Sequence, residues 1–460
     1  TCNTASQKTN ILLVFVDDMR PEINAFGIEK AVTPNLDKIA DNGTIFTNAY
    51  CNIPVCGASR ASIMSGIRAG IHRFKNYLST VERDVPGAVT IPETMKNNGY
   101  NTISYGKVFH NPDDQKGQWD EIWKSDLPLW TNPESLEKFE VLGKGPITEI
   151  SIKGDDAYPD GEVAKKAIRK LKEQKKSDKP FFMSIGFLRP HLPFCAPKKY
   201  WDLYPEGYIK PAENNFIPKN APKRSIHNSG ELRQYTDIPD GPVQDSMAYQ
   251  LVRGYYASLS YSDAMIGKVM NELKSQGLDR NTVVIVIGDH GWNLREHTLW
   301  AKHANYRTSL RTPLLVSGPN ILKGQKLDGL VEFIDLYPTI CDIIDTEGPK
   351  EQMAGKSFKE ALYKPNVKLK EFVIPQFKNG VTIITEKEAY TEYLNKDLSL
   401  GDAMYYDRIN DIDENINLCD NPEYQDRINE LSKIMHENWG KYFDVKSDKL
   451  GEILKEINNR

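Results

Sequence analysis

The stretch CNIPVCGASRASIMSG, residues 51–66, contains a cysteine, a serine and an arginine at spacings that could do chemistry. Ser59 follows Cys56 by three positions, and Arg60 follows it by one helical turn if the segment is a helix. A thiolate would be an adequate nucleophile for an acyl group, but no papain-like or caspase-like signature surrounds Cys56. Cys56 is therefore either a structural thiol or a nucleophile for some other reaction.

Two further pairs of polar residues come directly after apolar runs. Asp17 and Asp18 follow ILLVFV, and Asp289 and His290 follow TVVIVIG. A single such aspartate is more often a loop residue that caps a helix. Two pairs at two strand ends favour a shared crevice, where three carboxylates would repel one another unless a cation neutralised them. Carboxylates favour calcium or magnesium, whereas the imidazole of His290 leaves zinc or manganese open.

The elements that must position these residues alternate along the first 340 residues. Four short apolar runs, rich in β-branched and aromatic residues, predict buried and mainly parallel strands at 11–16, 102–105, 181–187 and 282–288. Apolar residues recur every three to four positions over 163–174 and over 255–277, which predicts two amphipathic helices. Such alternation is typical of an α/β sandwich.

The pattern changes after residue 365. FVIPQF, VTIITE and AYTEYL predict antiparallel strands, and PEYQDRINELSKIMHENWGKYF predicts a closing amphipathic helix. We therefore predict an N-terminal catalytic domain over 1–365 and a smaller α+β domain over 366–460. The segment 205–245, rich in proline and asparagine, is expected to be a long surface excursion.

Composition excludes several classes of protein. The 460 residues are 39% hydrophobic and 27% charged, which is ordinary for a globular chain. A net charge of −4 gives no excess of basic residues of the kind that binds nucleic acid. No apolar run approaches the roughly 18 residues that cross a bilayer. Six cysteines without a C-x-x-C predict neither a zinc framework nor a disulfide scaffold. Cys2 is either an incidental cysteine or the lipid-bearing residue of a bacterial lipoprotein.

Cys56, Ala58, Ser59 and Arg60 match the C-x-[AP]-S-R signature of the type I sulfatases, in which the cysteine is oxidised to formylglycine. The resemblance extends from residue 10 to about 440, through blocks such as NILLVFVDDMRP, TPNLDKIADNGTIFTNAY, TIPETMKNNGYNTISYGKVFH and IGDHGWNLREHTLWAKHANY. GKVFH, RPHLPF and DHGW most resemble iduronate 2-sulfatase and bacterial uronate 2-O-sulfatases. The resemblance implies an alkaline phosphatase-like α/β fold with a large, mainly parallel sheet and a smaller C-terminal domain that contains an antiparallel sheet.

The same resemblance assigns a metal site. Asp17, Asp18, Asp289 and His290 would hold the ion together with an oxygen of modified Cys56. Many family members carry asparagine where His290 stands, and the iduronate-type members carry histidine. The resemblance implies calcium, whereas the histidine leaves zinc or manganese open.

Formylglycine has a physical rationale. A sulfate ester on an ordinary serine would hydrolyse very slowly, whereas a hydrated aldehyde carries two hydroxyls on one carbon. One hydroxyl attacks sulfur and expels the sugar hydroxyl, and loss of the proton from the other then ejects sulfate as C=O forms again.

The resemblance also implies roles for residues around the sulfate. Arg60 would brace the nucleophile and help to neutralise the sulfate. Lys107 would bind sulfate, and His110 would remove the proton from the second hydroxyl. His191 and Lys302 would lie near the leaving oxygen, where they bind sulfate and donate the departing proton.

Four residues are candidates for contact with the sugar. Arg73 and Phe74 occupy positions where iduronate-type sulfatases place groups that meet the uronic acid, and an arginine would suit its carboxylate. Trp292 and Tyr306 could flank the ring. For each of the four the alternative is ordinary packing or surface chemistry.

The predicted substrate is a sulfated glycosaminoglycan fragment of the heparin, heparan or chondroitin type, with sulfate at position 2 of a uronic acid. The predicted partner is a formylglycine-generating or radical maturase, and the predicted location is periplasmic or secreted. Two alternatives remain open. One is a metal-dependent phosphodiesterase or phosphonate hydrolase, and the other is a non-catalytic glycan-binding relative, which the presence of every expected ligand and both histidines disfavours.

Overall fold

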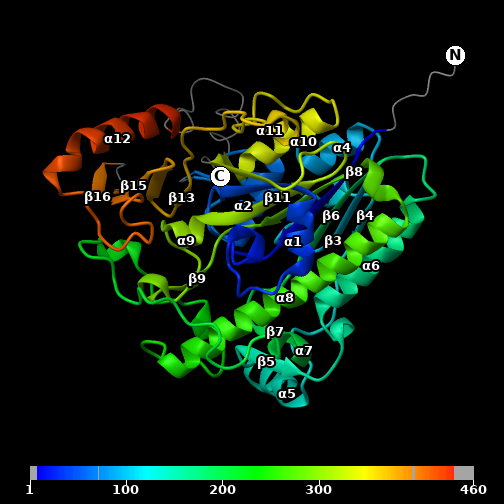
Figure 1. Cartoon of the computed structure of the whole chain (residues 1–460), viewed down its shortest axis with the longest axis horizontal. Helices are drawn as coiled ribbons and strands as arrows, with labels where there is room; N and C mark the ends of the chain where they lie inside the picture. The colour runs from blue at the N-terminus through cyan, green and yellow to red at the C-terminus, as the bar shows by residue number, and fades with distance from the viewer. Residues whose placement is uncertain (1–7, 71, 396–398, 440–460) are drawn as a thin grey trace.

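A large sheet forms the centre of the molecule in the computed structural model, which describes residues 8–70, 72–395 and 399–439 (Figure 1). Its eight strands run in the order β12 (Gln325–Glu332), β2 (Gly43–Tyr50), β11 (Arg311–Ser317), β8 (Thr282–Gly288), β1 (Asn10–Val16), β6 (Phe181–Phe187), β3 (Asn101–Gly106) and β4 (Glu121–Trp123). Only β11 is antiparallel to its neighbours. The predicted mainly parallel sheet is confirmed.

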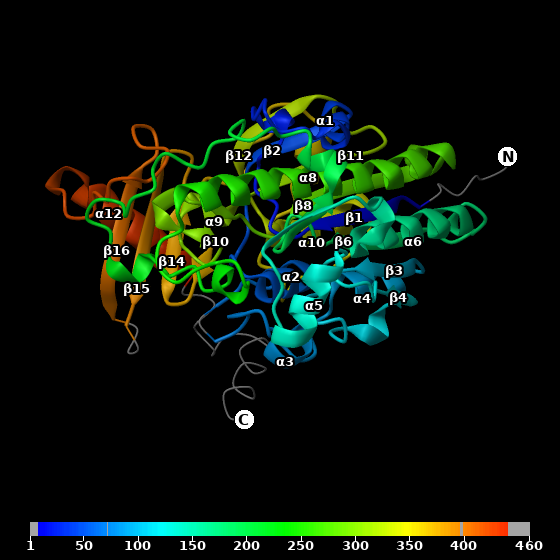
Figure 2. The ribbon, with the colours of Figure 1, turned by 90° about the horizontal axis from the view of Figure 1, so that it is seen from below.

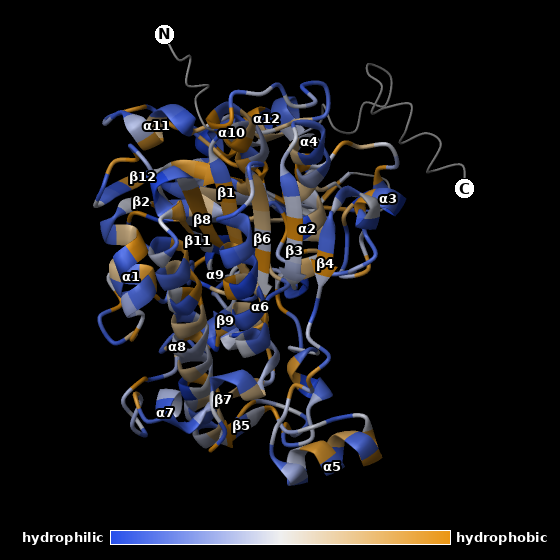
Figure 3. Ribbon diagram, turned by 90° about the vertical axis from the view of Figure 1, so that its right-hand side faces the viewer, coloured by the Kyte–Doolittle hydropathy of each residue, from blue (hydrophilic) through white to orange (hydrophobic). Residues whose placement is uncertain are grey.

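Strand β1 contributes to both layers of the sandwich, because successive side chains of a strand point to opposite faces. Leu12, Val14 and Val16 belong to one apolar core, and Ile11, Leu13 and Phe15 belong to the other. The first core is covered by α1 (Pro34–Asp41), α6 (Pro159–Gln174) and α8 (Asp245–Ser275). The second is covered by α2 (Cys56–Ser65), α4 (Ile91–Asn97) and α10 (Leu336–Ile343). Hydropathy colouring shows the apolar strands between these helices (Figure 3).

The two helices predicted for the N-terminal part of the chain correspond to α6 and α8. Helix α8 begins ten residues before the predicted start and packs along α6. It ends at Ser275, and Gly277 follows in the left-handed conformation with φ of 66°. A left-handed residue ends the helix, and glycine adopts this conformation without the strain that a side chain would cause.

A second, antiparallel sheet lies at one end of the molecule (Figure 2). It consists of β13 (Gln376–Phe377), β14 (Gly380–Ile384), β15 (Glu388–Leu394) and β16 (Leu400–Asp407), and α12 (Gln425–Trp439) packs on it. The predicted C-terminal antiparallel sheet is therefore confirmed, although FVIPQF forms only a two-residue strand. The boundary at residue 365 stays a prediction.

Short elements complete the described chain. They are α3 (Val81–Asp84), α5 (Pro133–Leu142), β5 (Thr148–Ser151), β7 (Phe194–Pro197), α7 (Lys198–Trp201), β9 (Asn293–Leu294), β10 (Trp300–Ala301), α9 (Arg307–Leu310) and α11 (Lys359–Tyr363). None of the helices in the described part of the chain combines the length and the apolar character that crossing a bilayer requires. Cys2, the predicted lipidation position, lies outside the described residues.

The segment 205–244 is largely irregular, as expected for an excursion, but it does not stay on the surface. Ser229 and Leu232 are buried, and Ser229 Oγ accepts a hydrogen bond from the backbone of Trp300. This contact corrects the prediction of a surface excursion, because the segment brings Glu231 against the ends of the central strands.

A buried ion pair in the chain after the small sheet contacts the central sheet. Arg408 Nε lies 2.9 Å from Glu414 Oε1, and both side chains are buried. The guanidinium also donates to the hydroxyl of Tyr50 on β2, and Glu414 accepts from the backbone N–H of Arg307. Removal of either charge would leave the other buried without its counterion, which is costly.

We predict that Glu414→Ala lowers the free energy of unfolding by about 3 kcal/mol, because it leaves the Arg408 guanidinium without its carboxylate. Urea denaturation followed by circular dichroism measures this change. Glu360→Ala, which removes one partner of an exposed pair with Lys364, is the control and should leave the midpoint nearly unchanged. Equal midpoints for both variants would contradict the structural role of the buried pair.

Candidate active site

The tips of β1 and β8 lie side by side because these strands pair in parallel, with Val16 opposite Gly288. Asp17 and Asp18 follow one strand, and Asp289 and His290 follow the other. All four side chains are fully buried. Asp18 has φ of 60°, and its backbone N–H donates to Asp289 Oδ1 at 3.1 Å. The two predicted polar pairs therefore meet at one place.

Cys56 faces this cluster from the first turn of α2. Its Sγ lies 3.2 Å from His290 Nε2. The loop that carries Tyr77 packs directly on the start of α2, where a Cβ at Gly57 would overlap the Tyr77 carbonyl. Burial, and then the charge of Asp17, raises the pKa of the Cys56 thiol. An unmodified Cys56 would thus be a protonated thiol at neutral pH, and a thiol is a poor nucleophile.

Arg60, on the next turn of α2, fixes two of the carboxylates. Its Nε lies 2.8 Å from Asp289 Oδ2, and its Nη2 lies 3.4 Å from Asp17 Oδ1. The guanidinium also donates to the backbone carbonyls of Lys107 and Val108. This fully buried arginine holds the strand tips together in addition to supplying positive charge.

Two lysines reach the cluster from opposite sides. Lys107 contacts Asp17, and Lys302 Nζ lies 3.0 Å from Asp18 Oδ1. Burial alone would raise the pKa of Asp17, but the positive charge of Lys107 holds it well below its usual range. For Asp18, burial outweighs the effect of Lys302 and raises the pKa to about 6. The positive charges next to Asp18 therefore do not fully offset the cost of burying its anionic form.

Glu231 is a member of the site that the sequence did not reveal. Its Oε1 lies 2.7 Å from Lys302 Nζ and 3.1 Å from His191 Nε2. Burial would lower the pKa of His191, but the charge of Asp18 reverses the shift and raises it to about 10. No motif marks Glu231. The only signal was that two predicted cations, His191 and Lys302, required an anion beside them.

His110 lies on the other side of the cluster, after β3. Its Nδ1 is buried and has no hydrogen-bond partner among the residues that the structure describes. Burial, and then the charge of Lys107, lowers the pKa of His110 to about 3. The imidazole is therefore neutral over the physiological range, and in this environment it is a weak base.

The four predicted sugar contacts occupy different environments. Trp292 is buried next to the site, with its ring 5.0 Å from Lys302 Nζ. Arg73 is also buried, and its Nε donates to the backbone carbonyl of Arg68 at 2.8 Å. For Trp292 and Arg73, contact with substrate stays a prediction.

For Phe74 and Tyr306 contact with the sugar also stays a prediction. Both are fully buried in apolar clusters, and the Tyr306 hydroxyl lies 2.9 Å from Ser225 Oγ. Neither side chain offers exposed surface to a sugar in this structure. Their packing roles correspond to the alternative weighed for them.

The donors around the strand tips fit a divalent cation. One ligand atom from each of Asp17, Asp18, Cys56 and His290 lies within 4.8 Å of the others. Asp289 Oδ2 is 3.6 Å from His290 Nε2, so it borders the same space. Carboxylate and imidazole donors suit several divalent ions, and the elevated pKa of Asp18 is consistent with a site that needs a further cation.

We predict that a divalent ion stabilises the protein and that Asp18→Asn removes most of this effect, because the amide cannot supply anionic charge. Differential scanning fluorimetry after EDTA treatment and readdition of calcium, magnesium or manganese measures the shift in Tm. Asp420→Asn, at an exposed position far along the chain, is the matched control. If the Tm of the unsubstituted protein changes neither after EDTA treatment nor after addition of any of the three ions, the metal site is refuted.

Comparison with known proteins identifies the family. Residues 9–346 match the Sulfatase family model, and residues 295–440 match a model described as N-sulphoglucosamine sulphohydrolase, C-terminal. Iduronate 2-sulfatase of Mus musculus is 30% identical over 74% of this chain and 69% of its own. A sulfatase of Formosa agariphila is 28% identical over 93% of this chain and 86% of its own.

Solved structures share the fold. A structure titled as a complex with its substrate D-glucosamine-2-N,6-O-disulfate has a TM-score of 0.77 at 21% identity, and covers 96% of this chain and 99% of its own. The phosphonate monoester hydrolase of Agrobacterium radiobacter also has a TM-score of 0.77, at 18% identity over 94% of this chain and 96% of its own. These likenesses show the alkaline phosphatase-like architecture. Taken with the family model that matches most of its length, they establish that the chain belongs to the sulfatase family, whose enzymes hydrolyse sulfate esters.

Proposed function

We propose that this sulfatase removes the 2-O-sulfate of a uronic acid in a glycosaminoglycan fragment, with formylglycine at position 56 as nucleophile. The observation that carries the proposal is the convergence of Cys56, His290 and the aspartates of two strand tips in a chain 30% identical to an iduronate 2-sulfatase. Human iduronate 2-sulfatase, at 28% identity over 75% of this chain, supports the same substrate class.

The raised pKa of the Cys56 thiol supports modification at this position, because a buried protonated thiol is a poor nucleophile. A hydrated aldehyde there would present two hydroxyls to the cluster. A divalent ion held by Asp17, Asp18, Asp289 and His290, calcium by family resemblance, would supply positive charge next to the nucleophilic oxygen and the sulfate.

In the first step one hydroxyl of the hydrate gives its proton to a carboxylate of the cluster and forms a bond to sulfur, while the bond from sulfur to the sugar oxygen breaks. The sugar oxygen leaves with a proton from the pair His191 and Lys302. His191 suits this role because its raised pKa keeps it protonated at neutral pH. Lys107 and Arg60 lie on the opposite side, where their charges would balance the sulfate.

In the second step the neutral His110 takes the proton from the remaining hydroxyl. The electron pair forms C=O as the carbon–oxygen bond to the sulfate breaks, and water then hydrates the aldehyde again. The pKa of about 3 keeps His110 unprotonated in the free protein, and the negative charge of a bound sulfate would raise that pKa toward neutrality, where a general base is effective. No water needs to attack sulfur.

The proposal includes a maturation partner and a compartment. A formylglycine-generating enzyme or a radical maturase would oxidise Cys56. We place the protein in the periplasm or outside the cell. A lipid anchor at Cys2 is an additional option.

The substrate test uses defined disaccharides that carry a single sulfate at the 2-O, 6-O or N position, with sulfate release measured by ion chromatography. We expect release from the 2-O-sulfated uronate only. Release from the 6-position alone would overturn the proposed specificity within the sulfatase family. Faster turnover of an aryl phosphodiester than of any sulfate would instead favour a phosphodiesterase or phosphonate hydrolase.

Modification of Cys56 has a direct readout. Intact-protein mass spectrometry should show a loss of about 18 Da when the thiol becomes an aldehyde. Cys56→Ser should lack this loss and should have no sustained turnover, because a serine cannot expel the sulfate. Equal turnover by Cys56→Ser and the wild type would contradict a formylglycine mechanism and favour a glycan-binding role.

Glu231 should act as a positioning residue. We predict that Glu231→Gln lowers kcat roughly tenfold or more with a smaller change in KM, because Lys302 and His191 lose their shared counterion. Glu213→Gln, an exposed change in the same segment, is the control. Steady-state kinetics that show equal kcat for the two variants would exclude the positioning role.

A further inference from the structure

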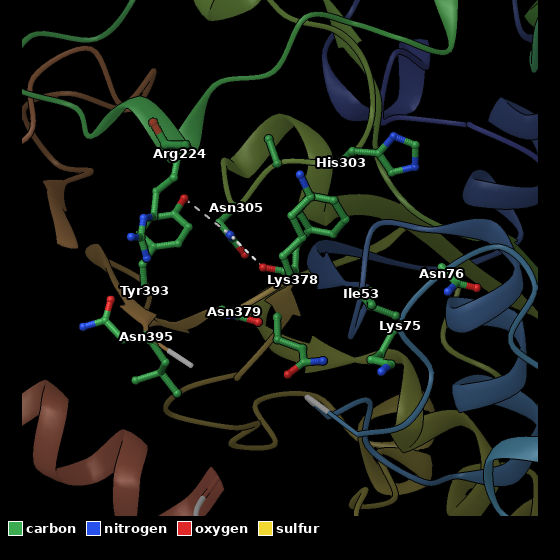
Figure 4. Close-up of a pocket in the computed structure, with 15 residues that line it drawn as sticks. Ile53, Lys75, Asn76, Arg224, His303, Asn305, Lys378, Asn379, Tyr393 and Asn395 are labelled. Carbon is green, nitrogen blue, oxygen red and sulfur yellow. Dashed lines mark hydrogen bonds between the residues drawn. The ribbon is translucent and has the colours of Figure 1, made fainter. Parts of the chain in front are cut away.

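A cavity of about 660 Å³ lies between the catalytic part and the small sheet (Figure 4). We call it the cationic pocket. Its walls come from six places far apart in sequence, at 53, 75–76, 224–225, 303–305, 376–379 and 393–395. None of the predicted catalytic or metal-binding residues lines it. The cationic pocket is therefore a separate space that the proposed mechanism does not use.

The charges on its walls point to an anionic ligand. Lys75, Arg224 and Lys378 line the pocket, and no aspartate or glutamate does so among the described residues. Arg224 is ion-paired with Asp402 at 2.7 Å, but the described contacts give Lys75 and Lys378 no carboxylate partner. Positive charge is thus gathered here in a chain whose net charge is −4. Such local enrichment favours a negatively charged ligand.

Two buried amide oxygens point to a ligand with hydroxyl groups. Asn305 Oδ1 and Gln376 Oε1 are buried at the pocket wall and have no hydrogen-bond partner in the part of the chain that the structure describes. The amide nitrogen of Asn305 is held in place by the carbonyl of Phe377 and the hydroxyl of Tyr393 (Figure 4). Unsatisfied buried acceptors are rare in proteins, and a sugar hydroxyl would satisfy each of them.

Two segments of the pocket wall continue along the chain into the catalytic cluster. His303, at its wall, is the residue after Lys302, whose Nζ contacts Asp18. The other segment, with Lys75 and Asn76, leads to Tyr77, which packs on the start of α2 and lies 5.9 Å from the ring of His110. A substrate with its ester at Cys56 could therefore extend into this space.

We propose that the cationic pocket binds a second anionic group of the substrate through Lys378 and Lys75. This group is a sulfate or a carboxylate, other than the ester itself, on the sugar that enters the pocket. The inference rests on the proposed glycosaminoglycan substrate but adds a recognition site that the proposed mechanism does not require. Asn305 and Gln376 accept hydrogen bonds from the hydroxyls of that sugar. Substrates with one negative group besides the ester bind more tightly than those without it.

The kinetic test uses two disaccharides that share a 2-O-sulfated uronate and differ only in a 6-O-sulfate on the hexosamine. For the variant Lys75→Ala with Lys378→Ala, we expect KM for the disulfated compound to rise about tenfold, with a smaller change in kcat. Lys387→Ala, an exposed lysine in the turn between β14 and β15, is the control and should leave KM unchanged.

The outcomes separate the sources of the anion. A selective rise for the disulfated compound supports recognition of the hexosamine sulfate. An equal rise for both compounds supports recognition of the uronate carboxylate. If KM for both stays within about twofold of the wild-type value, or if Lys387→Ala has the same effect, the proposal is wrong.

A binding experiment separates this proposal from the proposed function. Calorimetry on Cys56→Ala with a disaccharide that carries only a 6-O-sulfate needs no turnover. We expect a Kd that weakens about tenfold when Lys378→Glu is added. If Lys378→Glu weakens binding but the unsubstituted, mature protein cleaves no 2-O-sulfate, the proposed specificity is refuted and the pocket is supported. If the unsubstituted, mature protein cleaves the 2-O-sulfate but Lys378→Glu leaves the Kd unchanged, only the pocket proposal is refuted.

Discussion

Three carboxylates buried at the tips of two neighbouring strands impose the constraint on which the rest of the site depends. Asp17, Asp18 and Asp289 are fully buried, and none of them can stay ionised there without positive charge close by. Arg60 bridges two of them, and two lysines reach the cluster from its sides. The result is a compact cluster of alternating negative and positive side chains whose donors suit a divalent ion.

The topology of the sheet explains why these charges meet. β1 and β8 are adjacent and parallel, so the residues after their carboxyl ends emerge together. Helix α2 begins at Cys56 beside them, and its next turn carries Arg60. Cys56, the proposed nucleophile position, and Arg60 therefore belong to the same helix. Chemistry placed on rigid elements keeps its geometry better than chemistry placed on loops.

Much of this arrangement could be predicted from the sequence because local patterns encode it. The four apolar runs became β1, β3, β6 and β8, and the polar residues after β1 and β8 converge as expected. β16 was not predicted, since LGDAMYYD lacks a continuous apolar run. Glu231 was missed because it lies in an irregular segment that only tertiary contacts draw inward. The packing of Phe74 and Tyr306 in apolar clusters could not be predicted either, because an aromatic residue near a motif can fill the core equally well.

The central claim is that Asp17, Asp18, Asp289 and His290 surround one cation that faces position 56. Crystals grown with manganese test it most directly, through anomalous scattering measured near the manganese absorption edge. The account predicts a strong anomalous peak between the two strand tips, about 2.0–2.6 Å from carboxylate oxygens of both β1 and β8 residues. A saturated crystal with no peak at that position, or with a peak bound by one strand tip alone, would contradict it.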